Sequence, residues 1–148
     1  MQVTGEHRFT AKPELVWEIL LDPDALKEAI PSCESMTETG PNVYDVTLRV
    51  SMAAIKGTYR GRVAVTNQQP IDSFRLEITG KGRSGSATGG ARLTLSAEEH
   101  GTVVRYDAEV KAQGALARLG GRLLGGTTRL LLGQFFKSME KQVVARTT

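Results

Sequence analysis

The chain has 148 residues and a formal net charge of +3, and this length suits one domain with its own hydrophobic core. Cys33 is the only cysteine, so no internal disulfide can form, and Cys33, His7 and His100 are too few soft ligands for a zinc site. The N-terminus lacks the apolar segment of a signal peptide, and no apolar run approaches the ~20 residues of a membrane span. We therefore expect a cytoplasmic protein.

The charge is unevenly distributed along the chain. Residues 1–114 carry a net charge of −2, whereas residues 115–148 carry +5. A basic C-terminal region can meet nucleic acid, anionic lipid or an acidic partner protein. Nucleic-acid binding usually adds stacking aromatic residues or a recognised motif, and neither is present, so we expect no nucleic-acid partner.

The first elements in chain order are a strand and two short helices. Residues 2–10 alternate between apolar and polar side chains, which predicts a half-buried strand. Pro13 suits the first position of a helix, and this helix ends at Asp22 and Pro23. A second short helix is expected over residues 23–29, before Pro31.

A series of strands follows. Residues 33–39 are a strand candidate, and five further segments alternate with period two. Because each has one polar face, the sheet is expected to be antiparallel with one buried face. The inward positions are Tyr44, Val46, Leu48 and Val50; Tyr59, Gly61, Val63 and Val65; Phe74, Leu76 and Ile78; Ala91, Leu93 and Leu95; and Val104, Tyr106, Ala108 and Val110.

Residues 116–145 return to a helical pattern, about 45 Å long at ~1.5 Å per residue. Only this helix is long enough to cover the buried face of the sheet. The predicted fold is α+β: a curved antiparallel sheet of about six to seven strands wrapped around a long C-terminal helix, with two short helices after strand 1. Residues 1–148 show no internal repeat or linker, so we predict a single domain.

This order of elements resembles the helix-grip layout of the START/Bet v 1-like (SRPBCC) superfamily, and several segments are more specific. They resemble the G-subunit family of carbon monoxide dehydrogenase over nearly the whole chain. The segments are Pro13-Glu14-Leu15-Val16-Trp17, Leu21-Asp22-Pro23, Ala29-Ile30-Pro31-Ser32-Cys33-Glu34, Lys56-Gly57-Thr58-Tyr59-Arg60-Gly61, the glycine-rich hairpin at 80–90, and Gln134-Phe135-Phe136.

The resemblance implies a non-catalytic accessory protein of a molybdenum hydroxylase of carbon monoxide dehydrogenase type. Its implied job is to recruit that enzyme to the inner face of the cell membrane, or to carry a lipid-like electron acceptor such as menaquinone or ubiquinone. The partners implied are a hydrophobic small molecule, the oxidoreductase complex and a peripheral membrane contact. No covalently bound cofactor is implied.

Small residues on the helix and on the strands predict a cavity between them. Advancing the helix by ~100° per residue gives a stripe that we expect to face the sheet, small at its start and bulky at its end. Glycines can instead permit close packing or mark bulges in a curved sheet, and that alternative stays open. The stripe comprises Ala117, Gly121, Gly125, Thr128, Leu132, Phe135, Met139 and Val143.

The candidate ligand-binding set combines inward strand positions, this stripe and one apolar loop. His7 could donate to a ligand carbonyl or serve as an ordinary core histidine, and Met52 could form a lid. We predict no catalytic and no metal-binding residue. The set is His7, Met52, Tyr59, Gly61, Phe74, Ile78, Ala87, Gly89, Tyr106, Gly121, Gly125, Leu132 and Phe135.

Three functions compete at this stage. A carrier predicts an apolar cavity, whereas an adaptor without a ligand predicts a filled core. An enzyme of the polyketide cyclase or dehydratase kind predicts converging acid–base groups, for which His7 and a tyrosine are the candidates. A second stripe of leucines beside Arg118, Arg122 and Arg129 predicts a membrane or partner surface, unless other segments cover it.

Overall fold

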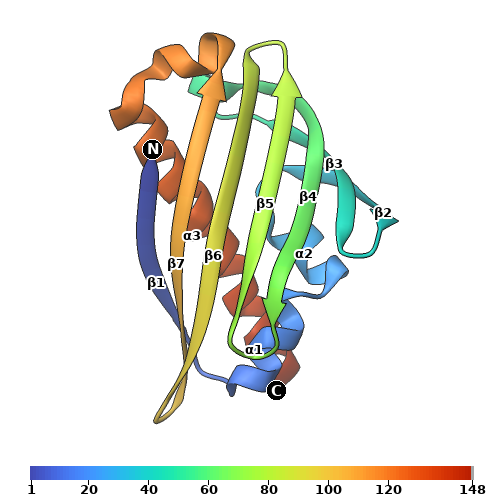
Figure 1. The fold of residues 1–148 in the computed structure, drawn as a ribbon, viewed down its shortest axis with the longest axis vertical. Helices are drawn as coiled ribbons and strands as arrows, with labels where there is room; N and C mark the ends of the chain where they lie inside the picture. The colour runs from blue at the N-terminus through green and yellow to red at the C-terminus, as the bar shows by residue number, and fades with distance from the viewer. Residues whose placement is uncertain (148) are drawn as a thin grey trace.

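Seven strands and a long C-terminal helix make up most of the molecule (Figure 1). The computed structural model describes residues 1–147. In chain order the elements are β1 (Gln2–Phe9), α1 (Pro13–Leu20), α2 (Pro23–Ala29), β2 (Cys33–Gly40), β3 (Val43–Val50), the 3₁₀ turn η1 (Ala53–Ile55), β4 (Gly57–Gln69), β5 (Ser73–Gly82), β6 (Gly85–Glu98), β7 (Gly101–Gln113), the 3₁₀ segment η2 (Gly114–Leu119) and α3 (Gly120–Thr147).

The strands form one antiparallel sheet in the order β1-β7-β6-β5-β4-β3-β2. Strands β2 to β7 are each paired with their neighbours in the chain, while β1 pairs with β7, with Gln2 opposite Glu109 and Phe9 opposite Thr102. The register places every predicted inward residue on the face turned toward α3, and the residues between them are mostly exposed. Period-two alternation therefore located the buried face correctly.

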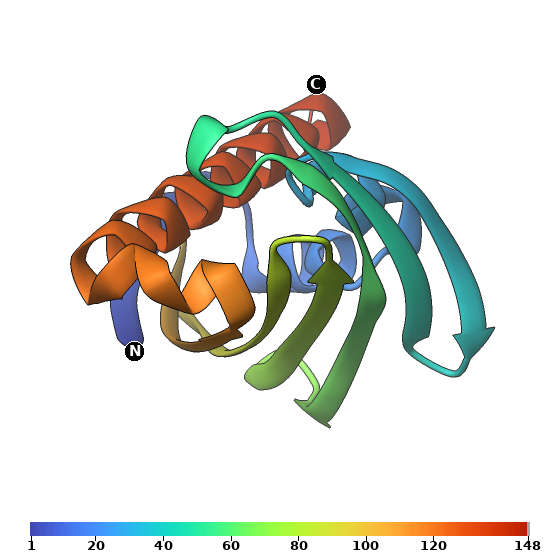
Figure 2. The same cartoon turned by 90° about the horizontal axis from the view of Figure 1, so that it is seen from above.

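The sheet curves around α3, which crosses its concave side (Figure 2). Helices α1 and α2 pack between the second half of α3 and the sheet, and their buried side chains belong to the core. Four α3 side chains are buried in it: Phe135, Phe136, Met139 and Val143. The predicted α+β helix-grip architecture is confirmed, including both short helices after the first strand.

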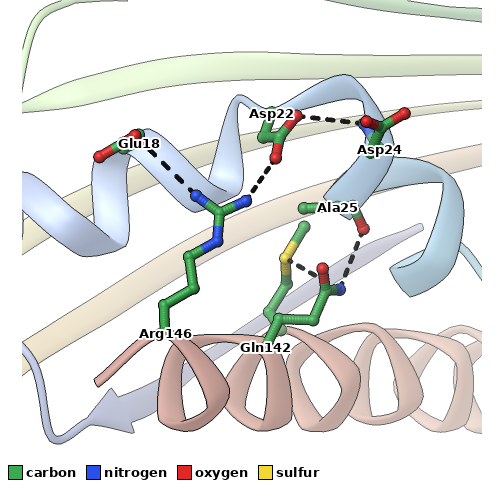
Figure 3. Close-up of polar contacts among 7 residues, drawn as sticks. Glu18, Asp22, Asp24, Ala25, Gln142 and Arg146 are labelled. Carbon is green, nitrogen blue, oxygen red and sulfur yellow. Dashed lines mark hydrogen bonds and ion pairs between the residues drawn. The ribbon is translucent and has the colours of Figure 1, made fainter. Parts of the chain in front are cut away.

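Polar contacts fasten the end of α3 to α1 and α2 (Figure 3). The Arg146 guanidinium lies 2.5 Å from Asp22 Oδ2 and 3.9 Å from Glu18 Oε1. Asp22 also caps α2, because its Oδ1 accepts from the Asp24 backbone N–H at 3.2 Å. Gln142 donates to the Ala25 carbonyl at 3.1 Å. This end of the grip is therefore held by packing and by charge.

The helical region after β7 differs from the expected continuous helix over residues 116–145. Residues up to Leu119 form the 3₁₀ segment η2, and Gly120 has φ = +80°, a left-handed conformation that glycine tolerates best. The chain turns there before α3 begins (Figure 1). No helix among residues 1–147 is long and apolar enough to cross a membrane.

Candidate functional site

An apolar cavity lies between the sheet and the first half of α3, with a volume of about 290 Å³. The core helices α1 and α2 fill the other end of the grip, so the space remains where α3 alone faces the strands. Side chains of β3 to β7, η1 and α3 line it, and residues 30–32 close one side.

Small residues on β6 leave this space open. Ala87, Gly89 and Ala91 occupy three consecutive inward positions of this strand, at every second residue, and all line the cavity. A Cβ added at Gly89 would make only ordinary contacts, the nearest being 3.6 Å from the Glu109 carbonyl oxygen. A Cβ therefore fits at Gly89, and a larger side chain would occupy part of the cavity.

Two other inward positions are glycine for a different reason, which is close contact with a neighbouring backbone. A Cβ at Gly61 would collide with the Thr79 carbonyl oxygen, and one at Gly85 with the Gln113 carbonyl oxygen. Gly85 also has φ = +121°. At these positions the alternative interpretation holds, because glycine permits close backbone approach in the curved sheet.

The ionisable side chains in the cavity wall are already engaged with protein groups. The Tyr59 hydroxyl donates to the Ile55 carbonyl at 2.7 Å, which ties β4 to η1. The Glu109 carboxylate is exposed and pairs with the Arg75 guanidinium, with a nitrogen–oxygen distance of 2.6 Å. The rest of the lining is mainly aliphatic, so the wall suits an uncharged, hydrophobic molecule.

The structure brings together six of the thirteen candidate residues. Two come from β6, one each from β4 and β5, and two from α3. They are Tyr59, Ile78, Ala87, Gly89, Leu132 and Phe135. Their contact with a ligand stays a prediction.

Three other candidates from the strands pack inside the protein. Phe74 is buried and meets the Trp17 ring edge-on, with ring centroids 5.5 Å apart. Tyr106 stacks on Phe136 at 5.1 Å. Gly61 is the close backbone approach described above. Phe74 and Tyr106 therefore belong to the core rather than to the cavity wall, because side chains of α1 and α3 reach the sheet there.

The structure corrects the prediction that the candidate glycines of α3 face the cavity. Gly121 is exposed, with nothing within 4 Å of an added Cβ, and Ala117 in η2 is also exposed. Gly125 is buried, but beneath the side chains of Met1 and Arg129. The α3 residues that line the cavity begin only at Leu124, and Gly125 lies on another side of the helix, so the start of the predicted stripe does not face the cavity.

His7 also lies outside the cavity. Its ring stacks on Phe136 at 5.6 Å and meets Phe9 edge-on at 4.9 Å. Its Nε2 is 3.4 Å from Glu140 Oε2, in a geometry that makes no hydrogen bond. Cys33 is in β2, at the opposite edge of the sheet from β1, and its thiol donates to the Ser35 carbonyl at 3.4 Å. No Cys–His pair forms between these two residues.

Sequence reasoning missed three residues of the α3 wall: Leu124, Thr127 and Leu131. Leu124 and Leu131 fell in the stripe assigned to the outside. Counting back from Phe135, a buried residue, would have found Leu131 at i−4 and Leu124 a further seven residues earlier. The helical face has to be set from buried residues such as Phe135, because the angles alone do not say where one stripe ends and the next begins.

A shallow hollow on the outer side of α3 contains the other part of the leucine stripe. We call it the outer hollow. Leu123 and Leu130 are 47% and 49% exposed beside Arg122, while Leu116 is buried. Met52, the candidate lid, lies here. The residues of the outer hollow are Met52, Leu119, Arg122, Leu123, Gly126, Thr127 and Leu130.

No cluster of three or more His, Cys, Asp or Glu side chains in residues 1–147 is arranged to hold a metal ion. None of the curated proteins matches the chain. Solved structures do match it. A conserved protein from Geobacillus kaustophilus is 29% identical, with a TM-score of 0.94 over 98% of this chain and 96% of that one.

Two more distant structures share the fold. A START superfamily protein from Mycobacterium smegmatis is 13% identical, with a TM-score of 0.76 over 99% of each chain. Ara h 8.0201 is 15% identical, with a TM-score of 0.72 over 98% of each chain. The model of the carbon monoxide dehydrogenase G-subunit family, CoxG, matches residues 5–144, nearly the whole length. This chain therefore belongs to the CoxG family, with a START-like helix-grip fold.

Proposed function

We propose that this protein is a non-catalytic carrier that holds a hydrophobic small molecule in the cavity under α3. The observation that carries the proposal is the cavity itself, which is apolar and kept open by Ala87, Gly89 and Ala91. A filled core at these positions would have favoured an adaptor without a ligand. The cyclase-like alternative required His7 beside a tyrosine in the cavity, and His7 is not in its wall.

The cargo we propose is a quinone, menaquinone or ubiquinone, or another lipid-like molecule. A volume of about 290 Å³ is at the lower limit of ligand pockets, which typically measure about 300–1,000 Å³. Such a space admits one ring system or one chain segment, so the remainder of a long isoprenoid or acyl tail would extend outside. The proposed partner enzyme, from the family assignment, is a carbon monoxide dehydrogenase-like oxidoreductase.

Native mass spectrometry of the purified protein, followed by solvent extraction, tests the carrier proposal. A stoichiometric adduct that releases a quinone or another lipid supports it and identifies the cargo. A clean apo mass together with no binding of added menaquinone, ubiquinone or palmitate contradicts it and favours the adaptor function.

The outer hollow supports a second element of the proposal, contact with the inner surface of the cell membrane. Leu123 and Leu130 present apolar side chains next to Arg122, and the neighbouring Arg118 and Arg129 are exposed as well. Apolar side chains flanked by arginine suit the interface of an anionic bilayer. Such a surface would place the protein beside a source of lipid-like cargo.

Vesicle sedimentation tests this contact. We expect binding to vesicles that contain phosphatidylglycerol, weaker binding to pure phosphatidylcholine, and loss of binding in the double variant Leu123→Ser, Leu130→Ser. A control double variant on the outer face of the sheet, Arg60→Ser with Arg92→Ser, removes two exposed charges and should bind more than the leucine variant. Equal binding by wild type and the leucine variant would refute the assignment of this surface.

A further inference from the structure

Two consecutive threonines on α3 line the cavity but differ in their hydrogen bonding. The Thr128 hydroxyl donates to the Leu124 carbonyl at 2.8 Å, the usual arrangement for a threonine within a helix. Thr127 is only 8% exposed, yet its hydroxyl makes no hydrogen bond with any group in the described part of the chain. Thr127 therefore carries a hydroxyl that is free to donate to a bound molecule.

The Thr127 hydroxyl borders open space. Within residues 1–147, His7 Nε2 is the one fully enclosed side-chain nitrogen or oxygen that lacks a partner. The Thr127 oxygen is therefore not sealed by protein atoms. The residue belongs to the walls of both the cavity and the outer hollow, so it lies where α3 separates them. As a residue of the cavity wall, Thr127 is placed to meet a molecule bound there.

The other polar side chains of the wall are not available in the same way. Tyr59 and Glu109 already bond to protein groups, and Ser32 and Thr88 are exposed to solvent. A charged group in this cavity would have no compensating partner, which strongly disfavours a carboxylate or a phosphate. One free donor in an apolar wall suits one neutral acceptor.

We propose that the Thr127 hydroxyl donates a hydrogen bond to a carbonyl oxygen of an uncharged ligand and so sets the ligand's orientation under α3. This inference rests on the carrier function proposed above and adds a recognition residue and the ligand group that it recognises, a neutral carbonyl. Thr127 distinguishes them from hydrocarbons of the same shape, because only the carbonyl replaces the hydrogen bond that burial removes.

A matched pair of probes and a matched pair of variants test this. The probes are menadione and 2-methylnaphthalene, which share the same carbon skeleton and differ in the two carbonyl groups. The variants are Thr127→Val and Thr128→Val, each of which replaces a hydroxyl by a methyl of similar size. Isothermal titration calorimetry on the purified full chain gives the affinities, and thermal melting verifies the fold.

We expect Thr127→Val to weaken menadione binding about two- to tenfold, the effect of one net neutral hydrogen bond, and to leave 2-methylnaphthalene binding unchanged. Thr128→Val should leave the affinity for both probes within about twofold of wild type. The melting temperature of empty Thr127→Val should equal or exceed that of wild type, because valine removes an unpaired buried hydroxyl. Should Thr127→Val fail to fold, Thr127→Ser and Thr127→Ala provide the same comparison, and the serine variant should bind menadione more tightly.

The outcomes separate the two proposals. If wild type binds neither probe, the inference about Thr127 is overturned, whereas the carrier function is decided by the native mass spectrometry described above. If wild type binds both probes and Thr127→Val binds menadione as tightly as wild type does, the carrier function stands and the role of Thr127 is overturned. An equal loss in Thr128→Val also overturns it, because the effect would then belong to the helix as a whole.

Discussion

Filling the cavity from the strand side is the most direct test of its role. The variant Gly89→Leu places four carbons in the space that Ala87 and Ala91 border, and the first of them meets no atom closer than 3.6 Å. The leucine excludes about four ligand carbons from the cavity, and at ~0.8 kcal/mol for each buried carbon the ligand loses about 3 kcal/mol of binding free energy. We therefore expect the affinity for menadione to fall about a hundredfold.

The stability of the same variant should change little. Burial of a leucine side chain contributes about 1.5–3 kcal/mol, and removal of glycine from a strand interior contributes about 0.5–1 kcal/mol. Overpacking costs about 1–3 kcal/mol, so the free energy of unfolding should stay within about 1 kcal/mol of wild type or rise. Urea unfolding measures this, and equilibrium dialysis measures menadione uptake.

Gly121→Leu is the matched control, because it makes the same substitution at an exposed glycine with open space around it. This variant should take up menadione as wild type does. Wild-type uptake by a folded Gly89→Leu protein would refute the reasoning, since it would place the bound molecule outside the cavity. Loss of uptake in both variants would show that the effect is not specific to the cavity.

Other parts of the molecule give further predictions. Asp22→Ala should lower the free energy of unfolding by about 1–2 kcal/mol, because it removes both the α2 cap and the Arg146 contact. Asp22→Asn keeps the cap and should lower it by only about 0.5 kcal/mol. Equal losses in urea unfolding would contradict a capping role. Gly133→Ala should raise the melting temperature, with about 0.5–1 kcal/mol of stabilisation, because an added Cβ meets open space on α3. Gly61→Ala should lower the melting temperature sharply, because the new Cβ collides with the Thr79 carbonyl. An unchanged melting temperature in Gly61→Ala would mean that the strands can separate there. Burial raises the pKa of the Cys33 thiol, so less of the reactive thiolate is present in the folded protein. Iodoacetamide at mildly alkaline pH should therefore modify Cys33 more slowly in the folded protein than in the urea-unfolded chain. Equal rates would contradict this prediction.

The strands could be predicted from the sequence because each strand residue points to one of only two faces, and its near neighbours in the chain show which one. A residue such as Ile78 is either inward or outward, and alternation with Arg75 and Glu77 decides which. The same rule placed Ala87 and Gly89 on the cavity side. The cavity side of helix α3 has to be chosen from a continuous range of angles instead, and the predicted stripe excluded Leu124 and Leu131, which line the cavity.

Other features depended on three-dimensional register, which one sequence does not reveal. Gly61 and Gly89 give the same signal, an inward glycine in an alternating strand. The structure separates them, since the backbone of β5 approaches Gly61 whereas Gly89 faces space. Likewise, inward parity was correct for His7, but its position along the grip, beside Phe136, depends on how α3 packs on β1.

The pairing of β1 with β7 has a consequence for how the chain reaches this architecture. Strands β2 to β7 follow one another as hairpins, so their contacts close short loops and can form early. The β1–β7 pair joins residues as far apart as Gln2 and Glu109, 107 positions along the chain, so it forms only after a long stretch of chain has been ordered. We expect this pairing and the docking of α3 to be the late steps of folding. Until then the concave face stays uncovered, so hydrophobic molecules present during synthesis can reach the inner wall before the grip has closed.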